Sequence, residues 1–307
     1  MTSKTLIAVV GPTAIGKTKL GIQLAEHFNT EVVSADSRQF FREMNIGTAV
    51  PSEEELNTVP HHFIQHKSIF EPYSVGDFEK DVLATLDKIF KIKDHAVIVG
   101  GSGLYVDAVI KGLDEFPKVK PQLRETLNQK FKEEGLPYLQ KELLSKDPEY
   151  YAIVDIENPH RLIRALEICM TTNQPYSSFL NQKKAVRMFD SLYVGIDADR
   201  EVIYERINNR VDLMMEAGLL TEAEKLYPNR HLNALQTVGY RELFQYFDGN
   251  FTLDFAISEI KKNTRRFAKR QLTWLRKNNS ILWVGYDDEP EAIASKIKQH
   301  LLNTSDE

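Results

Sequence analysis

Cysteine is almost absent from this chain of 307 residues, in which Cys169 is the only one. A single cysteine cannot form an intramolecular disulfide, and zinc sites built from several thiolates are excluded. The 8 histidines could still supply metal ligands, but no short cluster of histidines and carboxylates suggests a zinc site. A reducing, cytoplasmic location is the default expectation for such a composition.

Long apolar runs are missing as well. No stretch approaches the ~20 apolar residues needed to span a bilayer. The apolar run at residues 6–10 is too short for the hydrophobic core of a signal peptide. We therefore expect neither a secretory leader nor attachment to a membrane.

An excess of positive charge is also lacking. The 39 basic side chains are outnumbered by 44 acidic ones, which gives a formal net charge of −5. No global positive field would attract nucleic acid, so any such binding must use a local patch. The 42% hydrophobic and 27% charged residues are ordinary for a globular protein, and they exclude a mainly disordered or fibrous chain.

Short apolar runs rich in β-branched residues recur along the chain and are typical of buried parallel strands. They occupy residues 6–10, 31–34, 96–99, 192–196 and 281–284. Helical spacing of apolar residues occurs between them, at 18–28, 77–92, 200–216 and 254–277 and from about 290 onward. This alternation predicts an α/β fold in which a parallel sheet carries helices on both faces.

The character of the sequence changes near Pro117. From there to about residue 184 the chain is charged, lacks a convincing strand and contains helical patterns interrupted by prolines. Asn158 and Pro159 resemble an N-cap followed by proline at the first helical position, which predicts a helix over 160–170. We predict an inserted all-helical domain at 117–189, within a core formed by 1–116 and 190–307.

The clearest motif is G-x-x-x-x-G-K-[ST], which follows the first predicted strand. It consists of Gly11, Pro12, Thr13, Ala14, Ile15, Gly16, Lys17 and Thr18. The glycines let the backbone fold into a cradle of N–H groups at the positive end of the next helix, which favours an anion. Lys17 would place its charge on the terminal phosphate, and the Thr18 hydroxyl would bind Mg²⁺. The fold class is therefore expected to be P-loop NTPase-like.

One part of the usual ATPase machinery is missing. An ordinary P-loop ATPase has an apolar strand that ends in an aspartate, which helps to hold the metal. Here the strand at 96–99 ends in Gly100 and Gly101. Asp197, after the strand at 192–196, could substitute, although a strand-end turn or a helix cap is the simpler role for it. The motif thus recognises a polyphosphate without saying whether it belongs to ATP.

Polar residues also follow the second and third predicted strands. Asp36 could accept a proton or a hydrogen bond from an N–H or O–H nucleophile, whereas an Asx turn is the alternative without function. Its neighbours Ser37, Arg38 and Gln39 are suited to reading a base edge or a phosphate. Ser102 is the only hydroxyl within a turn of three glycines, which allows close approach of backbone or ligand. Ligands bind at the carboxyl ends of strands in such sheets, so these turns should share one site with the P-loop.

A basic helix is predicted near the C-terminus. Residues 261–277 carry eight basic side chains and no acidic one. Helical spacing puts apolar side chains on one face, namely Ile257, Ile260, Phe267, Trp274 and Leu275, and cationic ones on the other, namely Lys262, Arg265, Arg266, Lys269 and Arg276. The cationic face is either simply solvated or binds RNA or another phosphate-rich partner.

Two arginine pairs have the spacing to converge on an anion. Arg206 and Arg210 are one helical turn apart, and Arg161 and Arg164 are three residues apart. Either pair could equally be bridged to nearby carboxylates, and spacing alone does not decide.

Taken together, the motifs resemble those of the bacterial tRNA dimethylallyltransferases, the IPP transferase family. The matching segments are GPTAIGKT, SADSRQ, IGTAVP, GGSGLY, NPHRLIRALE, QTVGYREL and TRRFAKRQLTWLR. They occur in the expected order and cover nearly the whole chain. Departures are small: Ile15 stands where Ser is usual, Ser102 where Thr is usual, and Phe40-Phe41 replaces an aliphatic–Tyr pair.

The resemblance implies a specific reaction. Dimethylallyl diphosphate would bind the P-loop with Mg²⁺, and the exocyclic amine of an adenosine beside the anticodon of a tRNA would attack its allylic carbon. By position, Asp36 would act as the general base or would orient the amine, with Ser102 hydrogen-bonding nearby and Arg210 stabilising the departing diphosphate. Contacts with the tRNA anticodon stem-loop would come from Asp36, Ser37, Arg38, Gln39, Ser102, Arg124, His160, Arg161, Leu162, Ile163 and Arg164. A monomer is expected.

Two other classes of function share some of these features. A P-loop kinase of a small metabolite or nucleoside would also use the P-loop, the Arg206/Arg210 pair and Asp36, but it would consume ATP and would not need the basic helix. An RNA-binding ATPase or GTPase module without further chemistry would not require Asp36 or Ser102.

Overall fold

The computed structural model describes residues 4–181 and 186–305. The chain separates into two compact units. One combines Met1–Ile110 with Arg187–Glu307, and the other is Lys111–Val186.

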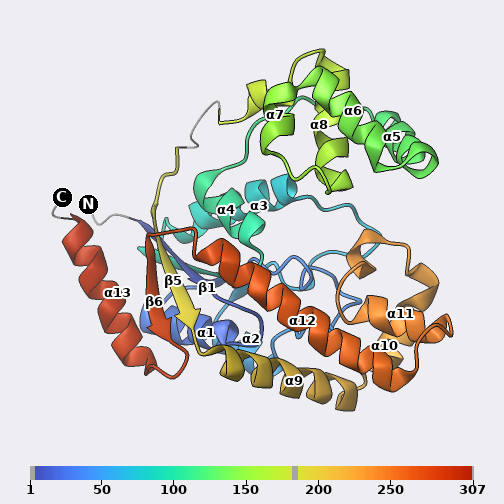
Figure 1. The fold of residues 1–307 in the computed structure, drawn as a ribbon. Helices are drawn as coiled ribbons and strands as arrows, with labels where there is room; N and C mark the ends of the chain where they lie inside the picture. The colour runs from blue at the N-terminus through green and yellow to red at the C-terminus, as the bar shows by residue number, and fades with distance from the viewer. Residues whose placement is uncertain (1–3, 182–185, 306–307) are drawn as a thin grey trace. The chain divides into compact units, whose positions relative to one another are not determined.

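The first unit is built on a six-stranded sheet whose pairs are all parallel, in the order β3-β2-β4-β1-β5-β6. The strands are β1 (Thr5–Val10), β2 (Val32–Ser34), β3 (His61–His62), β4 (His95–Gly100), β5 (Asp190–Asp197) and β6 (Ile281–Gly285). Figure 1 shows β1, β5 and β6 side by side. The predicted parallel sheet is therefore confirmed, and β3 is a further strand at its edge.

Apolar side chains of the central strands alternate between two hydrophobic clusters, one on each face of the sheet. Leu6 and Ala8 belong to one cluster, and Ile7 and Val9 to the other. Because both clusters also contain helical residues, helices cover both faces, as predicted. The cluster with Ile7 includes residues of α1 (Lys17–His27), α9 (Arg200–Glu216) and α13 (Pro290–Ser305). The cluster with Leu6 includes residues of α3 (Val75–Ile89), α4 (Gly103–Lys111), α10 (Leu219–Leu226), α11 (Tyr240–Phe247) and α12 (Leu253–Leu275).

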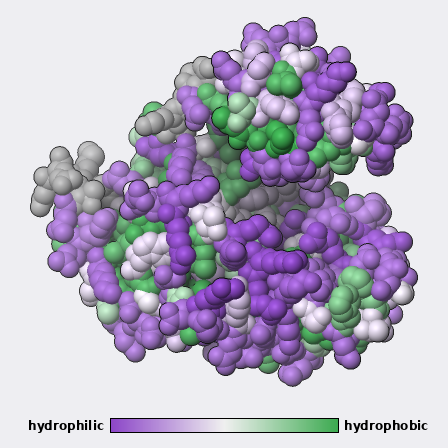
Figure 2. All heavy atoms as spheres, viewed as in Figure 1, coloured by the Kyte–Doolittle hydropathy of each residue, from purple (hydrophilic) through white to green (hydrophobic). Residues whose placement is uncertain are grey.

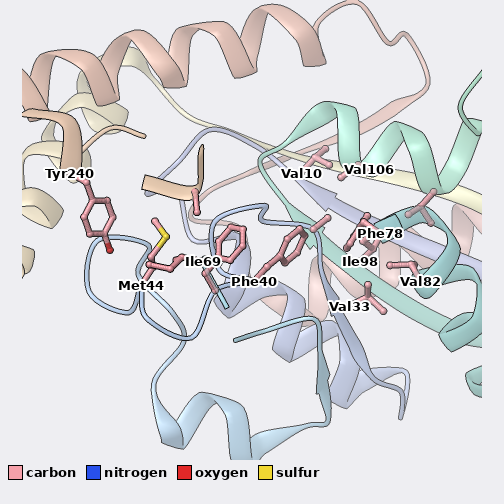
Figure 3. Packing of buried hydrophobic residues seen from close by; sticks show 14 of the residues in the cluster. Val10, Val33, Phe40, Met44, Ile69, Phe78, Val82, Ile98, Val106 and Tyr240 are labelled. Carbon is pink, nitrogen blue, oxygen red and sulfur yellow. The ribbon is translucent and has the colours of Figure 1, made fainter. Parts of the chain in front are cut away.

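The segment after β2 is anchored in the core of this unit. Phe40 is fully buried and its ring stacks on that of Phe78, with centroids 5.1 Å apart. Figure 3 shows Phe40 in a row of buried side chains with Ile69 and Phe78. Helix α2 (Glu53–Thr58) follows and is capped by Ser52, whose side chain accepts a hydrogen bond from the Glu55 N–H. The turn that carries Asp36 is thus tethered between a strand and a packed aromatic residue.

Every regular element among the described residues of the second unit is helical. These elements are α5 (Pro121–Glu134), α6 (Leu136–Lys146), α7 (Pro148–Ile153), α8 (Pro159–Thr172) and a 3₁₀ turn at Tyr176–Phe179. The prolines lie in the first turns of these helices, where a missing N–H costs nothing. The predicted cap of α8 is confirmed, because the Asn158 side chain accepts a hydrogen bond from the Arg161 N–H.

Within the described residues, no helix has both the length and the apolar character that crossing a membrane requires.

Candidate active site

Two cavities lie at the carboxyl ends of β1, β2 and β4. Their volumes are about 460 and about 260 Å³. Both are lined by Thr13, Lys17, Asp36, Gly101 and Arg210. The structure therefore brings the P-loop, the acidic turn and the glycine turn together, although they are far apart in the sequence.

The P-loop connects β1 to α1. Gly16 caps α1 with a φ of 110°, in the left-handed region where a side chain is strained. Ala14 also has a positive φ, 66°, and the buried side chain of Ile15 joins the hydrophobic cluster that contains Ile7. Ile15 thus anchors the loop to the apolar cluster on one face of the sheet.

Lys17 and Arg210 are half-buried beside the Asp36 carboxylate. Loss of solvent around the ammonium and, second to it, the nearby charge of Arg210 lower the pKa of Lys17, and the opposing effect of Asp36 leaves it at about 8. Burial likewise lowers the pKa of Arg210, again opposed by Asp36, although an arginine stays protonated in proteins. Two cations facing one carboxylate leave an excess of positive charge, which suits a polyanionic ligand such as a diphosphate.

Side-chain hydrogen bonds within the site engage backbone groups of the P-loop. The Lys17 ammonium donates to the Pro12 carbonyl at 2.7 Å. The Thr13 N–H donates at 2.8 Å to the side chain of Gln271 from α12. Arg206 lines the larger cavity and donates at 2.9 Å to the Ala14 carbonyl. Arg206 therefore supports the loop, while Arg210 lies deeper, between the two cavities.

The Asp36 turn is compatible with both roles that the sequence left open. The Asp36 Oδ1 accepts the Arg38 N–H at 3.0 Å, so the Asx turn is present. The same residue lines both cavities. Across from it, the hydroxyls of Ser37 and Ser102 lie 3.4 Å apart. The turn thus holds the carboxylate in place at the cavity wall and leaves it able to act on a ligand.

The next two residues of this turn are engaged inside the protein. The Arg38 guanidinium donates to the carbonyls of Asn233 and Ala234, at 3.1 and 3.0 Å. Gln39 is buried, and its amide nitrogen donates to the Ala49 carbonyl at 2.9 Å. Its amide oxygen accepts from the Ser34 hydroxyl. The Gln39 side chain is therefore an internal anchor at the wall of the larger cavity, and its contact with RNA stays a prediction.

Residues predicted to contact RNA in the helical unit separate into two groups. The side chains of Leu162 and Ile163 are buried in the core of that unit. They lie on the apolar face of α8, so their side chains serve this core, and their contact with RNA stays a prediction. His160 and Arg161 are exposed, and their side chains remain available to a partner.

Arg124 and Arg164 converge on a buried carboxylate. Arg124 makes two hydrogen bonds to Glu167, at 2.6 and 2.9 Å, and Arg164 approaches the same carboxylate to 3.6 Å. Glu167 is only 3% exposed, whereas both arginines keep part of their side chains at the surface. The two cations therefore share a structural role and retain an accessible face.

Asp197 takes the simpler role expected for it. It ends β5, and its Oδ1 accepts the N–H of Ala198 at 3.0 Å. Asp197 is not among the residues that line the two cavities. Within the described part of the chain, no group of three or more His, Cys, Asp or Glu side chains is arranged to hold a metal ion.

The basic helix α12 faces the site on one side and solvent on another. Ile260 and Leu275 are buried, Trp274 donates its indole N–H to Asp107 at 3.2 Å, and Phe267 lines the smaller cavity. Arg265 is held against α9 by Asn208 at 2.7 Å. The exposed cations are Arg266, Lys269, Arg270, Arg276 and Lys277. Figure 2 shows hydrophilic side chains gathered over α12 and α9 on the face drawn.

Sequence reasoning missed two features of the smaller cavity. One is Gln271, and the other is the turn at residues 237–239, to which the sequence assigned no role. Gln271 lies one turn before Leu275 and is buried. A glutamine within the apolar stripe of a helix was a signal that could have been used, because a buried amide requires partners.

Comparison with known proteins gives consistent matches. The model of the family described as IPP transferase matches residues 39–278. A tRNA dimethylallyltransferase of Flavobacterium johnsoniae is 58% identical, over 98% of this chain and 99% of its own length. A second, from Christiangramia forsetii, is 59% identical over 97% and 99%.

Solved structures agree. A full-length tRNA isopentenylpyrophosphate transferase from Bacillus halodurans is similar with a TM-score of 0.74 and 38% identity, covering 99% of this chain and 98% of that one. A eukaryotic dimethylallyltransferase acting on tRNA is similar with a TM-score of 0.80 and 26% identity, covering 93% and 75%. The matches span nearly the whole chain in the order that its motifs predicted, and this chain belongs to the IPP transferase family.

Proposed function

We propose that this protein transfers a dimethylallyl group from dimethylallyl diphosphate to the N6 amine of an adenosine adjacent to the anticodon of a tRNA. The observation that carries the proposal is the pair of cavities with shared lining residues, where two half-buried cations lie beside a carboxylate. Lys17, Arg210 and Asp36 line both of them. Membership of the family and the names of its relatives support this substrate pair.

The chemistry follows from the charges. The C–O bond between the allylic carbon and the diphosphate breaks, and a C–N bond forms from the adenine amine. Lys17 and Arg210 neutralise the charge that develops on the departing diphosphate, in a site where burial strengthens their effect. Asp36 accepts the proton that the amine releases. The balance requires no oxidant and no ATP.

The smaller cavity also has an apolar wall. Ile207, Val211 and Met214 from α9 and Leu219 from α10 contribute to it. Such a surface suits the five-carbon group, because apolar area leaves water when the group binds. One cavity therefore offers charge for the diphosphate and an apolar surface for the chain attached to it.

Mg²⁺ is the expected cofactor, and its ligand would be the hydroxyl of Thr18, which lines the larger cavity. The residues present fit this ion, because Mg²⁺ takes oxygen ligands, keeps several waters and usually binds through substrate phosphates and few side chains. When bound, it would neutralise part of the diphosphate charge. Lys17 and Arg210 perform the same task from the protein.

The acceptor must leave its base stack to reach Asp36, since the amine of a stacked adenine is inaccessible. Stem-loop RNA offers such unstacked bases. The exposed cations of α12, together with His160, Arg161, Arg124 and Arg164 of the helical unit, are the candidate contacts with the tRNA backbone. Ser37 and Ser102 are the candidate contacts with the base.

One assay tests the function against its alternatives. The protein is incubated with unmodified tRNA, Mg²⁺ and either labelled dimethylallyl diphosphate or labelled ATP, and the RNA is then digested to nucleosides. Prenyl label in adenosine is the expected result. Phosphoryl transfer from ATP to a small acceptor would instead indicate a kinase, and binding of tRNA without transfer of either label would indicate a binding module.

A further inference from the structure

Gln271 joins two of the three strand-end turns that form the site. Its Oε1 accepts the Thr13 N–H of the P-loop at 2.8 Å. Its Nε2 donates to the Gly101 carbonyl of the glycine turn at 2.8 Å. The side chain is only 6% exposed, and both ends of its amide are used. One side chain thus spans the loop proposed to hold the diphosphate and the turn that carries Ser102.

The glycine turn is shaped around this amide. A Cβ added at Gly101 would overlap the Gln271 Nε2, while its next nearest neighbours, Gln271 Cδ and Lys17 Nζ, lie at 3.5 and 3.6 Å. Those two distances are ordinary contacts, and the φ of Gly101 is not in the left-handed region. The glycine at this position is therefore required by the Gln271 amide and not by the conformation of the backbone.

The geometry matters because the two turns would hold different reactants. The P-loop would fix the diphosphate of the donor. The Ser102 hydroxyl lies 3.4 Å from the hydroxyl of Ser37, which belongs to the turn proposed to contact the base. A misplacement of about 1 Å between reacting groups can slow a reaction about 100-fold. We propose that Gln271 is a positioning residue that sets the separation between the P-loop and the Ser102 turn, and with it the alignment of the two substrates. This proposal rests on the proposed function for its effect on rate, but not for its effect on structure.

The test is a double-mutant cycle of Gln271→Ala and Gly101→Ala, read as the single-turnover rate of prenyl transfer. In the native background, Gly101→Ala should slow transfer about 10-fold or more, because its methyl group displaces the amide. In the Gln271→Ala background, Gly101→Ala should have little further effect, since the space is open. An equal effect of Gly101→Ala in both backgrounds would overturn the proposal, because the methyl group would then be disturbing the substrate directly.

Gln271→Ala alone should lower the rate about 10- to 100-fold, with the affinity for tRNA and for inorganic pyrophosphate changed less than about 3-fold. A fall in either affinity that accounts for the whole loss of rate would contradict a positioning role. Thr273→Ala is the matched control on α12, because the Thr273 hydroxyl is exposed and bonds only to the Lys269 carbonyl of its own helix. Its rate should equal that of the unchanged protein.

Two further measurements test the proposal even if the proposed function fails or Gln271→Ala does not fold. Amide hydrogen exchange at Thr13 should rise about 10-fold in Gln271→Ala, a readout that needs no activity and survives failure of the proposed function. If Gln271→Ala does not fold, Gln271→Glu replaces it, because a carboxylate still accepts the Thr13 N–H but cannot donate to the Gly101 carbonyl. Unchanged exchange at Thr13 in Gln271→Ala, or an unchanged rate in Gln271→Glu, would overturn the proposal.

Discussion

Asp36 shows how one residue can close a turn and still line a cavity where it is proposed to act as a base. One carboxylate oxygen accepts the Arg38 N–H at 3.0 Å, which closes a turn and fixes the side chain. The residue nevertheless lines both cavities beside Lys17 and Arg210. An Asx turn and a general base are therefore compatible, because a carboxylate has several acceptor positions. Sequence alone treated them as alternatives.

Two substitutions of Asp36 can separate its part in the turn from its proposed role as a base. Asp36→Asn keeps an oxygen for the Arg38 N–H and removes the base, whereas Asp36→Ala removes both. We expect Asp36→Asn to lower the single-turnover rate of prenyl transfer about 100-fold or more, while tRNA binding by filter assay stays unchanged. Asp36→Ala should be at least as slow and should also loosen the turn. A native rate in Asp36→Asn would show that another group takes the proton.

Lys17 predicts a pH dependence of diphosphate binding. Its pKa is about 8 in the free protein, and a bound anion stabilises the protonated form and raises that pKa. Binding therefore takes up a proton above pH 8, and the affinity for pyrophosphate, measured by calorimetry, should fall as pH rises, approaching 10-fold per pH unit. Lys17→Arg keeps its charge throughout this range and serves as control, since titration of the ligand is common to both proteins. Identical profiles would mean that Lys17 is not the titrating group.

At the scale of elements, sequence patterns predicted the helices and strands whose signal lies within their own residues. The strands at residues 6–10 and 192–196 were predictable from short apolar runs, and the helix at 200–216 from the helical spacing of its apolar residues. Of the paired strands β2 and β3, only β2 was predicted from the sequence. Strand β3 contains two residues, His61 and His62, and is defined by its pairing with β2. Short runs of this kind carry no periodicity of their own.

Helices α10 and α11 were missed for a similar reason. Both have eight residues, and long-range contacts hold them. Glu222 of α10 accepts the N–H groups of Ile46 and Gly47, at 2.8 and 2.9 Å, and also the Tyr240 hydroxyl of α11. The candidate site divides in the same way. The P-loop and the strand ends were predictable from local sequence, whereas the positions of Gln271 and Gln39 depend on partners elsewhere in the chain.

Helix α12 supplies a prediction about the RNA surface. Arg266 and Lys269 are exposed cations on its outer face, and we expect the double change Arg266→Glu with Lys269→Glu to weaken tRNA binding about 10-fold or more at low salt. The slope of log K against log salt should become shallower by about one unit for each RNA phosphate that no longer meets a cation of the protein.

The control for this variant is a matched pair on another helix. Lys296→Glu with Lys298→Glu changes the same charge on α13, where Lys296 makes only an exposed salt bridge to Asp288 at 3.0 Å. Such a bridge contributes little to stability. If both pairs weaken tRNA binding equally, net charge and not the face of α12 governs the interaction.

At the scale of the whole molecule, the net charge and the division into two units both bear on how the protein would bind RNA. The chain has a net charge of −5, so it attracts RNA only where cations are gathered locally. The candidate cations lie in both units, on α12 in one and around Glu167 in the other. Compact units with separate cores commonly open independently. A residue of the helical unit can therefore affect RNA binding directly or through the stability of its own unit.

Arg124 allows these two effects to be separated. Removing it leaves the buried Glu167 carboxylate without its two shortest hydrogen bonds, which should cost the helical unit about 1–3 kcal/mol. In Arg124→Ala, amide hydrogen exchange should therefore accelerate in α5 and α8 and stay unchanged in β1 and β4. Arg161→Ala is the control for stability, because Arg161 lies exposed on the same helix as Glu167, and its exchange should match the native protein throughout. Acceleration that extends into β1 and β4 would mean that the two units unfold as one, and unchanged exchange in α5 and α8 would leave the Arg124–Glu167 pair without a stabilising role.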